Sequence, residues 1–232
     1  MEAVIFDIRG SIAHFRRPDT VVTHHSYPFI TRTALFGLVS AILGEEDLEG
    51  ERWFGLRLMN RVSSSFQQVS MLGKGWLGSG PAFNRQTAIE LVVDPHYRVH
   101  YSGRYTQELA QRIGSGKSVY TTYLGSAFCL TLPKLIRVEK LEEVDYYDEV
   151  TTSGVVPAHI IDELIVEPGM QYARCDGVRY RHVEDRVFDG VIDFVYEVSG
   201  GPIRFRPRVP LNRESEVPVK LVRGDSGVLC LW

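Results

Sequence analysis

Residues 4–44, VIFDIRGSIAHFRRPDTVVTHHSYPFITRTALFGLVSAILG, change their hydrophobic pattern twice. Four of the five residues from Val4 to Ile8 are apolar, and most are β-branched or aromatic, which predicts a buried strand. After Thr31 the apolar residues are three and four positions apart, which predicts a helix: Leu35, Leu38, Val39 and Ile42. Thr31 or Thr33 would cap its start, and Gly44 stands where many helices end in a left-handed residue. The segment therefore predicts a strand, a basic turn and a capped helix in succession.

The patterns downstream of this segment continue the alternation. We predict, in order, a strand, a polar and glycine-rich excursion, a strand, a helix and a strand, at 55–63, 64–86, 88–94, 105–113 and 119–124. Strand-helix-strand repeated twice is the split βαβ order of ferredoxin-like domains, which also underlies RNA-recognition modules. The expected fold class is therefore α+β.

The second half of the chain has a different residue pattern. Short alternating runs are separated by prolines and glycines, from Pro157 to Pro218, and no long periodic segment appears. We expect a ferredoxin-like domain at 1–147, with the excursion 64–86 inserted in it, and a small β-rich appendage at 148–232.

The composition is that of a globular protein, since 44% of the 232 residues are hydrophobic. No run reaches the roughly 18 apolar residues that cross a membrane. Glu2 and Asp7 stand where a secretory signal would be basic and then apolar. Cys129, Cys175 and Cys230 are odd in number and widely spaced, so neither a disulfide framework nor a zinc site is indicated. We expect a cytoplasmic protein without a metal site and without a membrane partner.

The net charge of -3 hides a segregation along the chain. Residues 57–138 hold ten Lys and Arg against three acids, a local charge of +7, whereas residues 139–167 hold nine acids and one Lys. A subunit that binds a polyanion on one face and contacts proteins with its other surfaces would have this distribution of charge. A solvated surface without partners would have it too, so charge alone leaves the function open.

Several motifs together resemble the CRISPR-associated Cas family five, in the RAMP superfamily. They are the first strand, Ala-His-Phe-Arg at 13–16, Ser26-Tyr27-Pro28, the helix from Arg32 to Gly44, and Tyr-Thr-Thr-Tyr-Leu-Gly-Ser at 120–126. The resemblance implies the subunit that holds the 5′ handle of the CRISPR RNA (crRNA) in a type I Cascade, most like type I-B. It also implies contacts with the backbone subunit and with the large subunit that reads target DNA.

Basic side chains around the end of the first strand and the start of the helix are candidates for holding RNA phosphate, because a helix N-terminus favours anions. They are Arg16, Arg17, His24, His25 and Arg32.

The excursion 64–86 supplies three more candidates: Lys74, Trp76 and Arg85. Four glycines between Gly73 and Gly80 argue against a regular element there. The resemblance implies a thumb that folds over the guide RNA, in which Trp76 would stack on a base. The alternative is a hairpin tip whose Trp76 packs back on its own domain.

The run Gly114-Ser115-Gly116-Lys117-Ser118 invites a nucleotide-binding interpretation, which its spacing excludes. Gln111 occupies the first glycine position of a P-loop, and a helix precedes the run where a P-loop has a strand. We interpret it as a helix-terminal turn in which Lys117 contacts RNA phosphate.

We expect no catalytic residue and no cofactor. The alternative is a metal-independent endoribonuclease that cuts precursor crRNA with His24, Tyr27 and Lys117, although no Lys-His neighbour pair supports it. An RNA-binding protein outside CRISPR immunity is a further alternative. Alternating arginines share a face in extended runs and would meet either RNA or an acidic neighbour: Arg179 and Arg181, and Arg204, Arg206 and Arg208.

Overall fold

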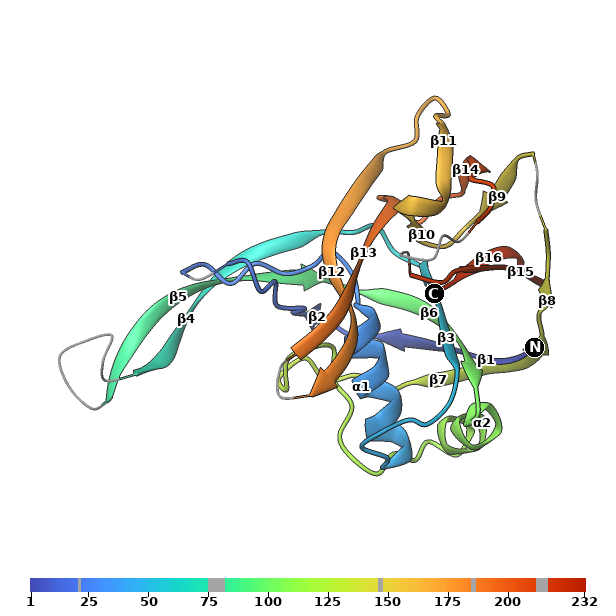
Figure 1. Ribbon diagram of the computed structural model, residues 1–232. Helices are drawn as coiled ribbons and strands as arrows, with labels where there is room; N and C mark the ends of the chain where they lie inside the picture. The colour runs from blue at the N-terminus through green and yellow to red at the C-terminus, as the bar shows by residue number, and fades with distance from the viewer. Residues whose placement is uncertain (21, 75–81, 146–147, 185–186, 212–216) are drawn as a thin grey trace.

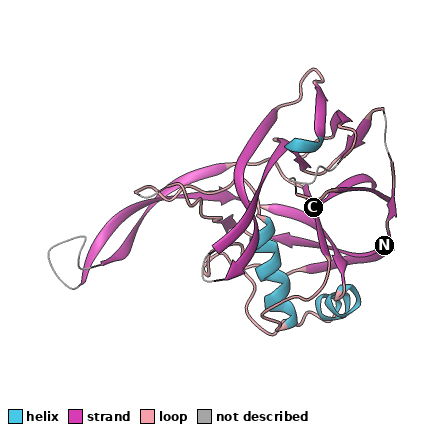
Figure 2. Ribbon diagram, in the orientation of Figure 1, coloured by secondary structure: helices cyan, strands magenta, loops and turns pink. Residues whose placement is uncertain are grey.

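The computed structural model describes residues 1–20, 22–74, 82–145, 148–184, 187–211 and 217–232. Within these ranges the chain is mostly β-strand, with two α-helices and a short 3-10 helix (Figures 1 and 2). An antiparallel sheet lies at its centre in the order β3-β6-β1-β7, formed by Arg52–Leu58, His96–Gly103, Glu2–Arg9 and Lys134–Lys140. Helix α1, Arg32–Leu43, follows β1, and helix α2, Thr106–Gly114, follows β6.

The two helices cover one face of this sheet. Alternate residues of β1, among them Phe6 and Ile8, are fully buried in the same cluster as Leu35 of α1 and Leu109 of α2. Because side chains alternate along a strand, the opposite face receives the intervening residues, including Asp7. The strand predicted at Val4 to Ile8 is therefore present, and it is buried as expected.

Helix α1 has the ends that the sequence predicts. The Thr31 hydroxyl accepts a hydrogen bond from the Ala34 amide at 3.3 Å. Gly44 is left-handed, with a φ of 82°, and its amide donates to the Ser40 carbonyl. These contacts satisfy backbone groups that a helix leaves unpaired at its ends.

Two strands of the sheet are not the ones we expect from the sequence. The third is β6 rather than 88–94, most of which forms part of a strand in another sheet, and the fourth is β7 rather than 119–124. The amides of Val119 and Tyr120 donate to the Ile42 and Ala41 carbonyls at the end of α1, at 3.2 and 2.9 Å. This segment therefore completes a helix terminus, and its β-branched and aromatic residues do not enter the sheet.

The polar excursion is a long hairpin of two regular strands, β4, Ser64–Lys74, and β5, Ala82–Val93. It projects from the body (Figure 1), and its base pairs with β2, Ile12–Ala13. Both faces of a projecting hairpin meet solvent over much of its length, so the apolar alternation that would predict strands is weak. Residues 75–81, which include Trp76, lie outside the described ranges.

The second half of the chain adds two more sheets. One has the order β11-β14-β9-β16-β15-β8 and the other the order β10-β13-β12. The strands are β8, Glu142–Glu143; β9, Val150–Thr152; β10, Val156–Pro157; β11, Ile161–Ile165; β12, Tyr172–Glu184; β13, Val187–Glu197; β14, Ile203–Pro207; β15, Lys220–Gly224; and β16, Gly227–Leu231. The 3-10 helix η2, Ala158–Ile160, joins β10 to β11.

One hydrophobic core runs through both halves. Phe29, before α1, meets Phe194 of β13 edge to face, with ring centroids 5.8 Å apart. Trp232 exchanges two backbone hydrogen bonds with Phe54 of β3, at 2.9 and 3.0 Å. The expected boundary at residue 147 stays a prediction, but apolar packing crosses it.

No helix in the described ranges is long and apolar enough to cross a membrane.

His100 of β6 makes the stability of the fold depend on pH. Burial, reinforced by Arg57 and Arg137, lowers its pKa to about 3 from an ordinary 6.5. The unfolded chain therefore takes up this proton near pH 6.5, whereas the folded chain does not until about pH 3. Stability falls as the pH drops between these values, by about 1.4 kcal/mol per unit.

We expect the free energy of unfolding to drop by about 2 kcal/mol more between pH 7 and pH 5 in the parent than in His100→Gln. Urea unfolding of both proteins at several pH values measures this difference. Equal slopes against pH would contradict the assignment, whatever the absolute stability of the variant.

Candidate functional site

A groove of 660 Å³ lies beside the start of α1. We call it the α1 groove. Its walls are residues 14–18, the first turn of α1 with the residues just before it, and the hairpin β12–β13. Gly125 also lines the groove.

The first wall is an extended strip held in place by backbone bonds. The Arg17 amide donates to the His25 carbonyl at 2.9 Å, and the Tyr27 amide donates to the Phe15 carbonyl at 2.8 Å. Neighbouring residues of an extended strip point to opposite sides. Arg16 accordingly lines the α1 groove, whereas Arg17 lines a second cavity of 580 Å³ on the other side.

The second wall is the N-terminus of α1. Thr31, Thr33 and Phe36 line the groove, and the first turn carries no acidic residue. The partial positive charge of a helix N-terminus favours an anion at this position. The two threonine hydroxyls, 3.2 Å apart, add hydrogen-bonding groups at the same end.

The third wall comes from the hairpin β12–β13. Arg179, His182 and Phe188 line the groove, and the His182 and Phe188 rings meet edge to face at 5.4 Å. The Tyr27 hydroxyl donates to the Gly177 carbonyl at 2.7 Å and ties the hairpin to the first wall. The groove thus unites segments about 150 residues apart in the chain.

The α1 groove is electropositive. Arg16, Arg179, His14 and His182 line it, and no carboxylate does among the described residues. Burial lowers the pKa of His14, even though its ring bonds to the Glu90 carbonyl, so His14 adds little positive charge at neutral pH. Phe36 and Phe188 add apolar rings between these polar groups.

This combination is chemically suited to single-stranded nucleic acid. Guanidinium groups and a helix N-terminus bind phosphate, and exposed rings stack on bases without regard to sequence. The groove volume falls in the range of sites that hold one or two nucleotide-sized groups.

The structure separates the candidates around the first strand. Arg16 lines the α1 groove, but Arg17 pairs with Asp19 at 2.9 Å, and His25 pairs with Glu90 at 3.0 Å. His24 stacks on His14, with ring centroids 6.5 Å apart. Burial and the nearby Arg16 lower the pKa of His24.

Arg32 is buried beneath the hairpin β12–β13 and does not line the α1 groove. Its guanidinium donates to the Tyr180 carbonyl at 3.1 Å and lies over the Tyr180 ring at 4.1 Å. Only 6% of its surface is exposed. Its observed contacts link α1 to β12.

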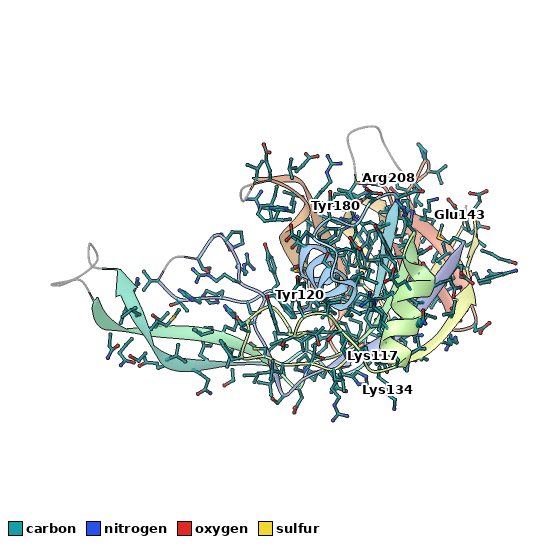
Figure 3. The ribbon with its side chains drawn as sticks, turned by 90° about the horizontal axis from the view of Figure 1, so that it is seen from below. Lys117, Tyr120, Lys134, Glu143, Tyr180 and Arg208 are labelled. Carbon is teal, nitrogen blue, oxygen red and sulfur yellow. The ribbon has the colours of Figure 1, made fainter. Side chains whose placement is uncertain are left out.

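The remaining candidates lie elsewhere. Lys74 ends β4, and Arg85 is on β5, close enough to His24 to lower its pKa. Lys117 follows α2. Figure 3 shows Lys117 and Lys134 near the lower edge of the body, apart from Tyr180 and Arg208 near the upper edge.

Two of the C-terminal arginines are paired with carboxylates. Arg204 and Arg206 share the exposed face of β14, as their alternation predicts, and both are paired with Glu149. Arg206 is also paired with Glu163. Both guanidinium groups therefore already have carboxylate partners within the same chain.

Sequence reasoning missed most of the α1 groove. His182 and Phe188 belong to no motif, and His14 and Phe36 belong to motifs of the family resemblance but were not among the candidates for RNA binding. The alternation of Arg179 with Arg181 was the one available signal. That alternation did not tell which of the two arginines lines a groove. Arg179 does, whereas Arg181 pairs with Asp189.

Comparison with known proteins identifies relatives of the fold. The family model described as CRISPR-associated protein (Cas_Cas5) matches residues 3–205. No curated protein matches the sequence. The crystal structure of a CRISPR protein from Archaeoglobus fulgidus aligns with a TM-score of 0.56 and 11% identity, covering 99% of this chain and 98% of the other.

A chain from a CRISPR RNA-guided surveillance complex aligns with a TM-score of 0.50 and 11% identity, covering 90% of this chain and 92% of the other. Identities this low show a shared fold. The family match is stronger evidence of relationship, because it spans the central sheet and all three walls of the α1 groove. The chain therefore belongs to the CRISPR-associated Cas_Cas5 family.

Proposed function

We propose that this protein is a non-catalytic subunit of a type I CRISPR effector complex, most like type I-B, and that it binds the 5′ handle of the crRNA in the α1 groove. The observation that carries the proposal is a groove with two arginines, a helix N-terminus and three phenylalanines, and with no carboxylate among its described lining. Family membership and the likeness to a chain of an RNA-guided complex support it.

The architecture fits the same proposal. The sheet order β3-β6-β1-β7 with helices after β1 and β6 supports a ferredoxin-like domain, a common RNA-binding scaffold. We propose that the projecting hairpin β4–β5 is a thumb, with Lys74, Trp76 and Arg85 toward the RNA. Its partners would be the crRNA, the backbone and large subunits and, through the complex, target DNA, all in the cytoplasm.

We expect Arg16→Ala and Arg179→Ala each to weaken binding of labelled repeat RNA by about tenfold. Each lost phosphate contact should also flatten the plot of log affinity against log salt by about one unit. Filter binding at several salt concentrations measures both effects. Arg204→Ala is the matched control, because its guanidinium is already paired with Glu149. Unchanged slopes in both groove variants would remove the α1 groove from RNA binding.

A metal-independent endoribonuclease is the second candidate, because His24 stacks on His14 at the edge of the α1 groove. Two observations weigh against a catalytic set of His24, Tyr27 and Lys117. The Tyr27 hydroxyl is engaged with Gly177, and burial raises its pKa. Lys117 is not among the residues that line the α1 groove. The same repeat RNA, resolved for cleavage, discriminates the two: a specific product lost in His24→Ala would favour the nuclease.

A further inference from the structure

Residues 121–132, between α2 and β7, form a narrow antiparallel ribbon. The Thr131 amide donates to the Thr122 carbonyl at 3.1 Å, and the Thr122 hydroxyl donates to the Thr131 carbonyl at 2.6 Å. Tyr123 and Leu130 form the next bridge of the same antiparallel register. Residues 121, 123, 130 and 132 therefore share one face, and Thr122 and Thr131 share the other.

The inner face of this ribbon is fixed to the body. The Thr131 hydroxyl donates to the Arg9 carbonyl at 2.8 Å, and the His14 amide donates to the Leu124 carbonyl at 3.1 Å. Leu124 is fully buried, and Cys129 is 1% exposed. The outer side chains thus stand on a backbone held by long-range bonds.

The outer face is apolar and open. Phe128 is 58% exposed, Leu130 61% and Leu132 74%, and Tyr123 lies beside Leu130. A ribbon with one buried face normally turns polar residues to solvent on the other. Apolar side chains on both faces indicate that the outer face is covered when the protein works.

The charged residues in and beside the ribbon are all basic along the sequence. No acidic residue occurs between Glu108 and Glu139 in the sequence. Lys117 and Lys134 bracket the ribbon, both are exposed, and neither has a carboxylate within ion-pair distance among the described residues. An apolar centre with a charged rim is the usual anatomy of a protein interface.

We propose that the outer face of the ribbon docks a protein partner that presents an apolar segment flanked by carboxylates. Aliphatic side chains at Leu130 and Leu132 offer no stacking plane, and two lysines are few for a nucleic-acid track, so protein fits this surface better than RNA. The fixed backbone lowers the entropy lost on docking. The proposal rests on the proposed function only in taking the partner from the same complex.

The test co-expresses the tagged chain with crRNA and the protein subunits of its CRISPR complex, digests the RNA with nuclease, and titrates the retained subunit. We expect the parent chain to keep a protein subunit after digestion. The double variant Leu130→Asp with Leu132→Asp should bind that subunit at least about tenfold more weakly. Lys117→Glu with Lys134→Glu should weaken it in a salt-dependent way. Val166→Asp, at an equally exposed apolar site outside the ribbon, should change nothing.

Thermal unfolding and repeat-RNA binding of the isolated Leu130→Asp, Leu132→Asp variant test whether it folds and binds RNA normally. Both measurements should match those of the parent. The proposal is overturned if no subunit is retained by the parent, or if the double variant retains it undiminished. A selective loss of RNA affinity would make the ribbon an RNA surface, and a parent dimer that becomes monomeric would make it a self-association surface. Failure of the parent to bind RNA, with the subunit retained, would instead refute the proposed function alone.

Discussion

Replacing Trp232 by alanine should lower the free energy of unfolding by about 3–5 kcal/mol. Trp232 is fully buried and meets Phe194 edge to face, with ring centroids 4.9 Å apart. Its backbone also pairs with Phe54 of the central sheet. The indole therefore fills the junction between the N-terminal sheet and the C-terminal strands, and its removal leaves a cavity in the core that both halves share.

Urea unfolding followed by circular dichroism measures the loss, with Tyr120→Ala as the control. Tyr120 is 60% exposed, so its truncation should change the stability by less than about 1 kcal/mol. A loss below about 1.5 kcal/mol in the Trp232 variant would mean that the junction is not part of a well-packed core. Two separate transitions in the parent would mean that the halves unfold independently.

Gly125→Ala should be the most damaging single substitution near the α1 groove. Gly125 is left-handed, with a φ of 83°, and a Cβ there would overlap the His14 carbonyl oxygen and lie 2.8 Å from its carbonyl carbon. Backbone cannot swing away as a flexible side chain can. We expect a loss of about 2–5 kcal/mol, from the left-handed conformation and from the overlap together.

The same substitution should weaken RNA binding, because it displaces the first wall of the groove at His14. Gly116→Ala is the matched control: Gly116 is also left-handed, with a φ of 65°, but a Cβ there would meet nothing within 4 Å. Its cost should be about 1–2 kcal/mol, with RNA affinity unchanged. If both variants lose the same stability and neither loses affinity, the His14 contact does not shape the groove.

Local patterns predicted the elements whose signals are complete within a few residues. Helix α1 has its apolar spacing, its Thr31 cap and its terminal Gly44 all within one short segment, and each was found in place. Strand β1 was equally readable, because its helix-facing side is uniformly apolar. The segment 119–124 misled for the opposite reason. Its residues favour a strand, but the amides of Val119 and Tyr120 donate to carbonyls at the end of α1.

The sequence by itself determined α1, β1, the alternation of strands and helices, and the motifs that point to the Cas_Cas5 family. Only the tertiary structure decided which charges face an open groove. Arg16 and Arg179 lie far apart in sequence and are brought together by the packing of the hairpin β12–β13 over α1, while Arg17, Arg204 and Arg206 find carboxylates. Arg17 has its partner Asp19 two residues away, but the partners of Arg204 and Arg206 lie more than 40 residues away in the sequence, so no local pattern shows whether these two side chains are free for RNA.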